Sequence, residues 1–127
     1  RSIITIRGDG LFDAGSATIS EKVQPLLARI ADALNSVQGN VLVTGHTDSQ
    51  PIRSARFTSN WHLSQERANS VAQQLATAAH PSDRIKAEGR ADTEPIAPNT
   101  TPAERARNRR VEITLFVANT VASGASR

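Results

Sequence analysis

The sequence contains no cysteine, methionine or tyrosine, and its aromatic residues are one tryptophan and three phenylalanines. Without cysteine the chain can form neither a disulfide nor a thiolate metal site. It has no run of about 18 consecutive apolar residues, so no segment of this sequence is expected to cross a membrane. The shortage of aromatic rings leaves few platforms on which nucleic-acid bases could stack. The cellular compartment stays open, because a chain without cysteine suits the periplasm and the cytosol equally.

The overall composition is that of one globular domain. Its 127 residues are 38% hydrophobic and 21% charged, enough to bury a core without covalent cross-links. The formal charge of +3 permits an anionic partner without requiring one. The chain starts at Arg1 within strand-like sequence, with neither an initiator methionine nor a signal peptide. We therefore expect it to be a domain excised from a longer protein.

Strand-like and helical patterns alternate along the first third of the chain. Residues 2–7 are rich in β-branched side chains and predict a strand, and the glycine-rich segment 8–17 predicts a loop. Residues 20–37 carry apolar side chains at the i, i+3, i+4, i+7 spacing of an amphipathic helix. Because proline is tolerated only in a first helical turn, Pro25 indicates that this helix begins nearer Gln24. Its apolar stripe comprises Val23, Leu26, Leu27, Ile30, Ala31, Leu34 and Val37.

The same alternation continues toward the C-terminus. Short strands are predicted at residues 40–45, 84–90 and 111–117, and a proline-rich loop at 91–102. A second helix is expected to begin at Ser64, because serine is a good N-cap and two helix-forming polar residues follow it. Its apolar stripe is made of small side chains that favour close packing on a sheet, namely Ala68, Val71, Ala72, Leu75 and Ala76.

These elements predict an α/β fold. Strands that alternate with helices indicate a two-layer sandwich, in which a mixed β-sheet carries its helices on one face. One further helical turn is expected within residues 103–110. Residues 1–118 should form the domain, and the small, polar residues 119–127 should form a flexible tail.

Asp48 and Arg67 are candidate binding residues. Asp48 follows a predicted buried strand and Arg67 lies in the first turn of the next predicted helix. If the loop between them folds back, a carboxylate and a guanidinium face one cavity and could hold the two ends of a zwitterion. The unpaired N–H groups of the helix start would add positive charge beside the anion. On spacing alone, a direct Asp48–Arg67 ion pair or a turn capped by Asp48 remains the simpler interpretation.

Four motifs in this chain resemble those of one family. They are "GHTD" at 45–48, "NWHLSQERA" at 60–68, "GRADTEP" at 89–95 and "NRRVE" at 108–112. In this order and spacing they are similar to the peptidoglycan-binding domains of the OmpA/MotB/Pal family, over roughly residues 3–116. Within that family the chain looks most like the periplasmic C-terminal extension of TssL, a membrane subunit of type VI secretion. MotB-type flagellar stator domains are the nearest alternative.

The resemblance implies a ligand and two principal contacts. The family binds the peptide stem of peptidoglycan through diaminopimelate, whose free end is a zwitterion. Asp48 of the GHTD motif would then hold the diaminopimelate ammonium, and Arg67 would hold its carboxylate. Thr47 would contribute its backbone or hydroxyl beside Asp48.

The resemblance also implies a supporting set of residues. Asn60 and Leu63 of the N-x-x-L pattern would shape the pocket wall. Asp13 matches a position near the same ligand, and Arg109, the first arginine of N-R-R, would support the pocket. With these motifs in place, a ligand-binding Asp48/Arg67 pair is favoured over a merely structural one.

Metal, cofactor and catalytic sites find little support in the sequence. His46, His62 and His80 share no metal-ligand spacing, and His46 is expected to brace the turn that contains it. No G-x-S-x-G elbow accompanies the serines, and no G-K-[ST] follows the glycines of residues 8–15, so neither a catalytic triad nor a nucleotide cofactor is expected.

Two other features have simpler explanations than a binding role. The basic cluster at residues 105–110 could be a nucleic-acid patch, but the scarcity of aromatic residues argues against nucleic acid as a partner. Trp61 precedes the predicted helix and is expected to be a core residue.

The sequence therefore predicts a non-catalytic domain that anchors a cell-envelope complex to peptidoglycan. It would be the periplasmic domain of an inner-membrane protein, attached to the membrane only through a segment outside this chain. Its partners would be a diaminopimelate-containing wall and the other subunits of a secretion complex. The alternatives are a MotB-like or Pal/OmpA-like anchor, a cell-wall hydrolase, and an assembly domain with a vestigial pocket.

Overall fold

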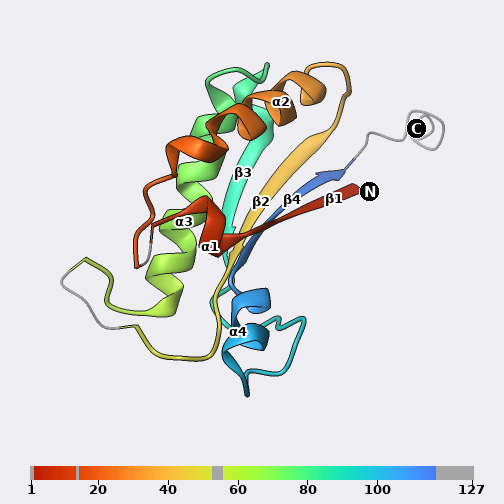
Figure 1. Ribbon diagram of the computed structural model, residues 1–127. Helices are drawn as coiled ribbons and strands as arrows, with labels where there is room; N and C mark the ends of the chain where they lie inside the picture. The colour runs from red at the N-terminus through yellow and green to blue at the C-terminus, as the bar shows by residue number, and fades with distance from the viewer. Residues whose placement is uncertain (1, 14, 53–55, 117–127) are drawn as a thin grey trace.

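A computed structural model describes residues 2–13, 15–52 and 56–116, which form a four-stranded sheet with helices (Figure 1). The sheet has the order β1-β4-β2-β3. Strand β4 is antiparallel to both β1 and β2, whereas β2 and β3 are parallel. The mixed sheet expected from the sequence is thereby confirmed, and the expected tail at 119–127 lies outside the described residues. The strands are β1 (Ser2–Arg7), β2 (Asn40–His46), β3 (Ile85–Gly89) and β4 (Arg110–Phe116).

Two helices, α2 (Gln24–Leu34) and α3 (Asn60–Ala76), cover the same face of this sheet (Figure 1). Alternate residues of a strand point to one face, so every second residue of β2 and β4 reaches the helices. Within the described ranges, no helix is both long and apolar enough to cross a membrane. The predicted two-layer α/β sandwich is confirmed. Its core includes Leu27, Ile30, Leu34, Val41, Val43, Val71, Leu75, Val111 and Ile113.

Helix α3 lies very close to strands β2 and β3. A Cβ atom built on Gly45 would stand 2.3 Å from the backbone oxygen of Ser64, and one built on Gly89 would stand 2.4 Å from the backbone nitrogen of Gln65. Both distances are far inside van der Waals contact, so only glycine fits at these two positions. The paired glycines thus fix how close α3, and every side chain on it, approaches the sheet.

The start of α3 differs from the prediction. The helix begins at Asn60, one turn before the expected Ser64, and its N-cap is Ser59, whose side chain accepts a hydrogen bond from the backbone N–H of His62. Ser64 is instead buried inside the helix. Trp61 therefore lies in the first turn, where it is 55% exposed rather than part of the core.

Two shorter helices occupy the end of the sheet where β2 ends and β4 begins. The segment predicted as a glycine-rich loop contains α1 (Gly8–Leu11), a single turn that follows β1 directly. The expected helical turn before the last strand is confirmed as α4 (Pro102–Asn108), which begins with a capping box formed by Thr101 and Glu104.

The Ser59 cap provides a test of the observed helix start. Substitution Ser59→Ala should lower the free energy of unfolding by about 1 kcal/mol, because the N–H of His62 loses its hydrogen-bond partner. Urea unfolding followed by circular dichroism measures this difference. The control is Ser70→Ala within α3, whose hydroxyl makes no hydrogen bond among the described residues and whose replacement should cost nothing. An equal stability of Ser59→Ala and wild type would contradict the assigned cap.

Candidate functional site

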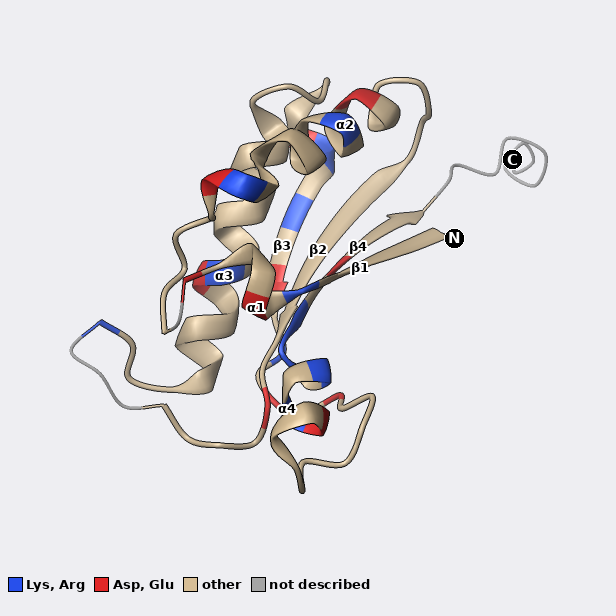
Figure 2. Ribbon diagram, in the orientation of Figure 1, with Lys and Arg blue, Asp and Glu red and all other residues tan. Residues whose placement is uncertain are grey.

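Charged side chains converge at the end of the sheet near α1 and α4, and Figure 2 shows acidic and basic segments meeting there. The topology explains why. Because β4 is antiparallel to both of its neighbours, its first residue, Arg110, lies opposite the last residues of β1 and β2, Arg7 and His46. The residues that follow β1 and β2 and the residue that precedes β4 therefore meet at one edge.

Arg109 joins two carboxylates at this edge. Its Nη1 donates to Asp48 Oδ2 at 2.5 Å, and its Nε and Nη2 donate to the two oxygens of Asp9 at 2.8 and 2.9 Å. These hydrogen bonds from Arg109 hold the pKa of Asp9 below its usual range, and the same carboxylates raise the pKa of Arg109. The other oxygen of Asp48 accepts from the backbone N–H of Gln50 at 3.0 Å. Asp48 is thus paired with Arg109 and not with Arg67.

Arg67 is a buried cation that has no paired anion in the part of the chain that the structure describes. It lies on α3, is 7% exposed, and its guanidinium is 4.8 Å from the centre of the Phe12 ring. Its Nε donates to the backbone oxygen of Ser16 at 2.7 Å, and no carboxylate among the described residues forms an ion pair with it. Burial lowers its pKa, although a guanidinium stays protonated at any physiological pH. A buried charge without a counter-ion is costly, so this position favours an anionic ligand group.

Arg67 and Arg109 line a common cavity of about 330 Å³ together with Asp9. Phe12 and two glycines complete its wall. Counting Asp48, which pairs with Arg109, the four charged groups sum to zero. Such a cavity suits a neutral ligand that carries one charge of each sign.

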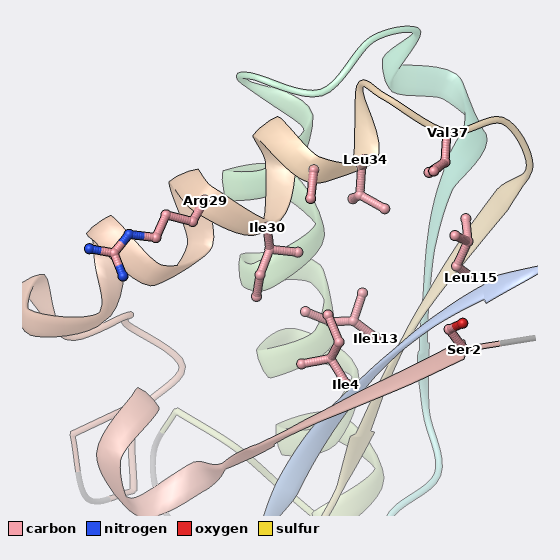
Figure 3. A pocket seen from close by; sticks show the side chains of 9 residues that line it. Ser2, Ile4, Arg29, Ile30, Leu34, Val37, Ile113 and Leu115 are labelled. Carbon is pink, nitrogen blue, oxygen red and sulfur yellow. The ribbon is translucent and has the colours of Figure 1, made fainter.

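A second hollow lies between α2 and the β1 edge of the sheet and has a different character (Figure 3). It measures about 290 Å³ and is lined by Ile4, Ile30, Ile113 and further apolar side chains. Among the described residues that line it, Arg29 alone is charged, and its guanidinium points away from the apolar side chains in Figure 3. These lining residues include no carboxylate and so offer no complement to an ammonium group.

Comparison with known proteins identifies the family. The family model described as the OmpA family matches residues 11–109. The chain belongs to the OmpA family. This confirms the resemblance found in the sequence motifs.

Three known proteins are similar to this OmpA family domain over most of its length. The solved structure of the cell wall anchor of the T6SS from Pseudomonas aeruginosa is 55% identical, with a TM-score of 0.87 over 91% of this chain and 81% of that chain. Uncharacterized protein YtxE of Bacillus subtilis is 38% identical, over 95% of this chain and 50% of the relative. Motility protein B of the same organism is 36% identical, over 90% of this chain and 44% of the relative. The chain thus spans half or less of the length of these two B. subtilis relatives.

Apart from Arg67 and Arg109, the residues expected at the site of this OmpA family domain, Asp48 included, are not among the lining residues of the cavity. Thr47 is buried, and its hydroxyl donates to the backbone oxygen of Asp48 at 2.8 Å. Asn60 donates to the backbone oxygen of Gln50 at 2.9 Å. These two side chains fix the turn that carries Asp48. Leu63 is buried on α3 outside the cavity lining, and Asp13 is exposed.

Sequence reasoning missed Asp9 and Phe12, which contribute a carboxylate and an aromatic face to the cavity. It also placed Arg67 too near the start of its helix. Because α3 begins at Asn60, Arg67 is the eighth residue of the helix, and its Cα lies about 10 Å along the axis from that of Asn60. Arg67 is therefore in the second turn and not in the first.

The other candidate sites have structural explanations. His46 is buried, and its Nε2 lies 3.4 Å from Glu112 Oε1. Within the described part of the chain, no three His, Cys, Asp or Glu side chains form a group that could hold a metal ion. Of the basic cluster at 105–110, Arg109 binds Asp9 and Asp48, and Arg110 is buried against Glu112. The guanidinium groups of these two arginines thus pair with carboxylates of the same chain and not with a polyanionic partner such as nucleic acid.

Proposed function

We propose that this domain binds the peptide stem of peptidoglycan through the zwitterionic end of diaminopimelate, and so anchors a cell-envelope complex to the wall. One observation carries the proposal. Arg67 is buried, has no paired anion among the described residues, and lines a cavity that is also lined by a carboxylate, Asp9. A free amino-acid terminus supplies the missing anion and, beside it, a cation for the carboxylates.

In this proposal each end of the ligand has its own partner in the cavity. Arg67 would form a forked pair with the diaminopimelate carboxylate, while the carboxylates grouped around Arg109 would receive the ammonium. A charge-assisted hydrogen bond contributes about 1.5–3 kcal/mol net, so the affinity of one site should be modest. Repeated stems in the wall and several copies of the domain in one complex would raise retention by avidity.

The complex served by this domain is proposed to be a type VI secretion apparatus. The support is the 55% identity to the cell wall anchor of the T6SS from P. aeruginosa, which exceeds the 36% identity to Motility protein B. In this proposal the domain lies in the periplasm, its membrane attachment is outside this chain, and its protein partners are other subunits of the secretion complex. An anchor in a flagellar stator is the second candidate.

The charge state of Asp9 supports a non-catalytic role. A general acid must hold a proton near neutral pH. The hydrogen bonds from Arg109 lower the pKa of Asp9, so this carboxyl is ionised under those conditions. The most exposed carboxyl of the cavity is therefore suited to binding a cation and not to protonating a leaving group.

The test is cosedimentation with purified sacculi that differ in one residue of the stem. Lysine keeps the ammonium of diaminopimelate but lacks its second carboxylate, so lysine-type sacculi would leave Arg67 unpaired. Binding should be about ten- to a hundred-fold weaker than to diaminopimelate-type sacculi, the equivalent of one charge-assisted bond. Sacculi with amidated diaminopimelate should behave like the lysine type. Equal binding to all three walls would contradict the proposed ligand, and release of soluble muropeptides would indicate a hydrolase.

A further inference from the structure

The two carboxylates bound to Arg109 differ in their access to the cavity. The side chain of Asp48 is 9% exposed and uses one oxygen for Arg109 and the other for the backbone N–H of Gln50. The side chain of Asp9 is 55% exposed and lines the cavity directly. A carboxylate has about four lone-pair positions, and Arg109 occupies only one on each oxygen of Asp9. Asp9 can therefore accept further donors without any rearrangement.

Asp9 and Arg67 supply the two opposite charges that a zwitterionic ligand needs. Both side chains line the same 330 Å³ cavity, and Asp9 is the carboxylate whose charge acts most strongly on the Arg67 guanidinium. An ammonium can reach Asp9 from the open cavity. Asp48 does not line this cavity and its side chain is nearly buried, so its remaining lone pairs are far less accessible to a ligand in the cavity.

We propose that Asp9 is the residue that receives the ammonium of the ligand, and that Asp48 acts indirectly by holding Arg109 in place. This inference rests on the proposed function, because it names the partner of one end of the same zwitterion. The ligand then spans the cavity from Asp9 to Arg67. Asp48, the residue expected from the family motif to bind the ammonium, becomes a positioning residue in this chain.

The experiment combines protein variants with a modified ligand. The ligand is the tripeptide L-Ala-γ-D-Glu-meso-diaminopimelate, either with its distal amine free or with that amine acetylated. Acetylation removes the ammonium and keeps the neighbouring carboxylate. The variants are Asp9→Asn and Asp48→Asn, and Asp83→Asn serves as a control with the same change of charge. Asp83 lies before β3, and so at the opposite end of the sheet from the cavity.

Isothermal titration calorimetry should show a specific pattern. Acetylation should weaken binding to the wild type, to Asp83→Asn and to Asp48→Asn by about ten- to a hundred-fold. Asp9→Asn should bind the unacetylated tripeptide about ten- to a hundred-fold more weakly than the wild type does. Acetylation of the ligand should then change the affinity of this variant less than three-fold. If Asp9 only oriented Arg109, Asp9→Asn would bind both tripeptides more weakly by the same factor. The effect of acetylation on the affinity therefore separates the two roles.

The outcomes distinguish this inference from the proposed function. If the wild type binds the free tripeptide and acetylation weakens Asp9→Asn as much as wild type, the assignment of Asp9 is overturned while peptide binding stands. If instead Asp48→Asn is the variant that no longer responds to acetylation, Asp48 is the ammonium partner. If the wild type binds neither tripeptide, the proposed function itself fails. Circular dichroism of each variant confirms that the fold is retained.

Discussion

Substitution Arg67→Met should weaken binding to diaminopimelate-type sacculi by about thirty-fold to a few thousand-fold. Truncating one partner of a buried charge pair costs about 2–5 kcal/mol, because the other charge is left desolvated without its complement. The reverse change, a ligand without the carboxylate, should weaken binding less, since Arg67 has no ion-pair partner among the described residues of the free domain. Quantitative cosedimentation over a range of sacculus concentrations measures the loss.

The Arg67→Met variant should remain folded. Methionine keeps an apolar chain against the Phe12 ring, and removal of the buried charge offsets the lost hydrogen bond to Ser16. The control is Arg29→Met, an exposed arginine on α2 with the same change of charge, which should bind like wild type. Unchanged binding by a folded Arg67→Met protein would rule out Arg67 as the carboxylate partner.

The sequence predicted α2 and the layer architecture because those features depend on local patterns. The spacing of apolar residues placed the helix, and Pro25 placed its start, which the structure confirms at Gln24. The start of α3 was wrong because two serines compete as N-caps. The structure uses Ser59, while the hydroxyl of Ser64 accepts a hydrogen bond from the backbone N–H of Ala91, far away in the sequence. A tertiary contact thus decides between two equivalent local signals.

The charge network of the site could be predicted only in part. The GHTD and L-S-x-x-R motifs pointed to Asp48 and Arg67, and both lie at the same end of the fold. The pairing of Arg109 with Asp9 and Asp48 could not be inferred, because the members of these ion pairs are 100 and 61 residues apart. Asp9 itself lies between two glycines, a context that indicates a turn rather than a site. Its role follows only from the antiparallel pairing of β1 with β4, which brings α1 to Arg109.

Substitution Gly89→Ala should destabilise the domain by about 3 kcal/mol or more. The added Cβ would meet Gln65 N at 2.4 Å and Gln65 Cα at 2.7 Å. Overpacking a core usually costs about 1–3 kcal/mol, and here the obstructing atoms are helix backbone, which cannot rotate away. Gly45→Ala should act similarly, because its Cβ would stand 2.3 Å from the backbone oxygen of Ser64. Against a typical stability of about 5–15 kcal/mol, either change should lower the melting temperature by about 10 °C.

The same substitutions should also weaken peptidoglycan binding in the fraction that stays folded. To bring the 2.3 Å contact at Gly45 into the ordinary range of 3.4–4 Å, α3 must retreat from the sheet by about 1 Å, and Arg67 must move with it. Gly10→Ala is the matched control, because a Cβ at Gly10 meets no atom within 4 Å, and its stability should lie within about 0.5 kcal/mol of wild type. Thermal unfolding and cosedimentation at 10 °C separate the two effects. A Gly89→Ala protein as stable as Gly10→Ala would show that α3 does not need the glycine pair, and that the spacing between Arg67 and the sheet is set by other contacts.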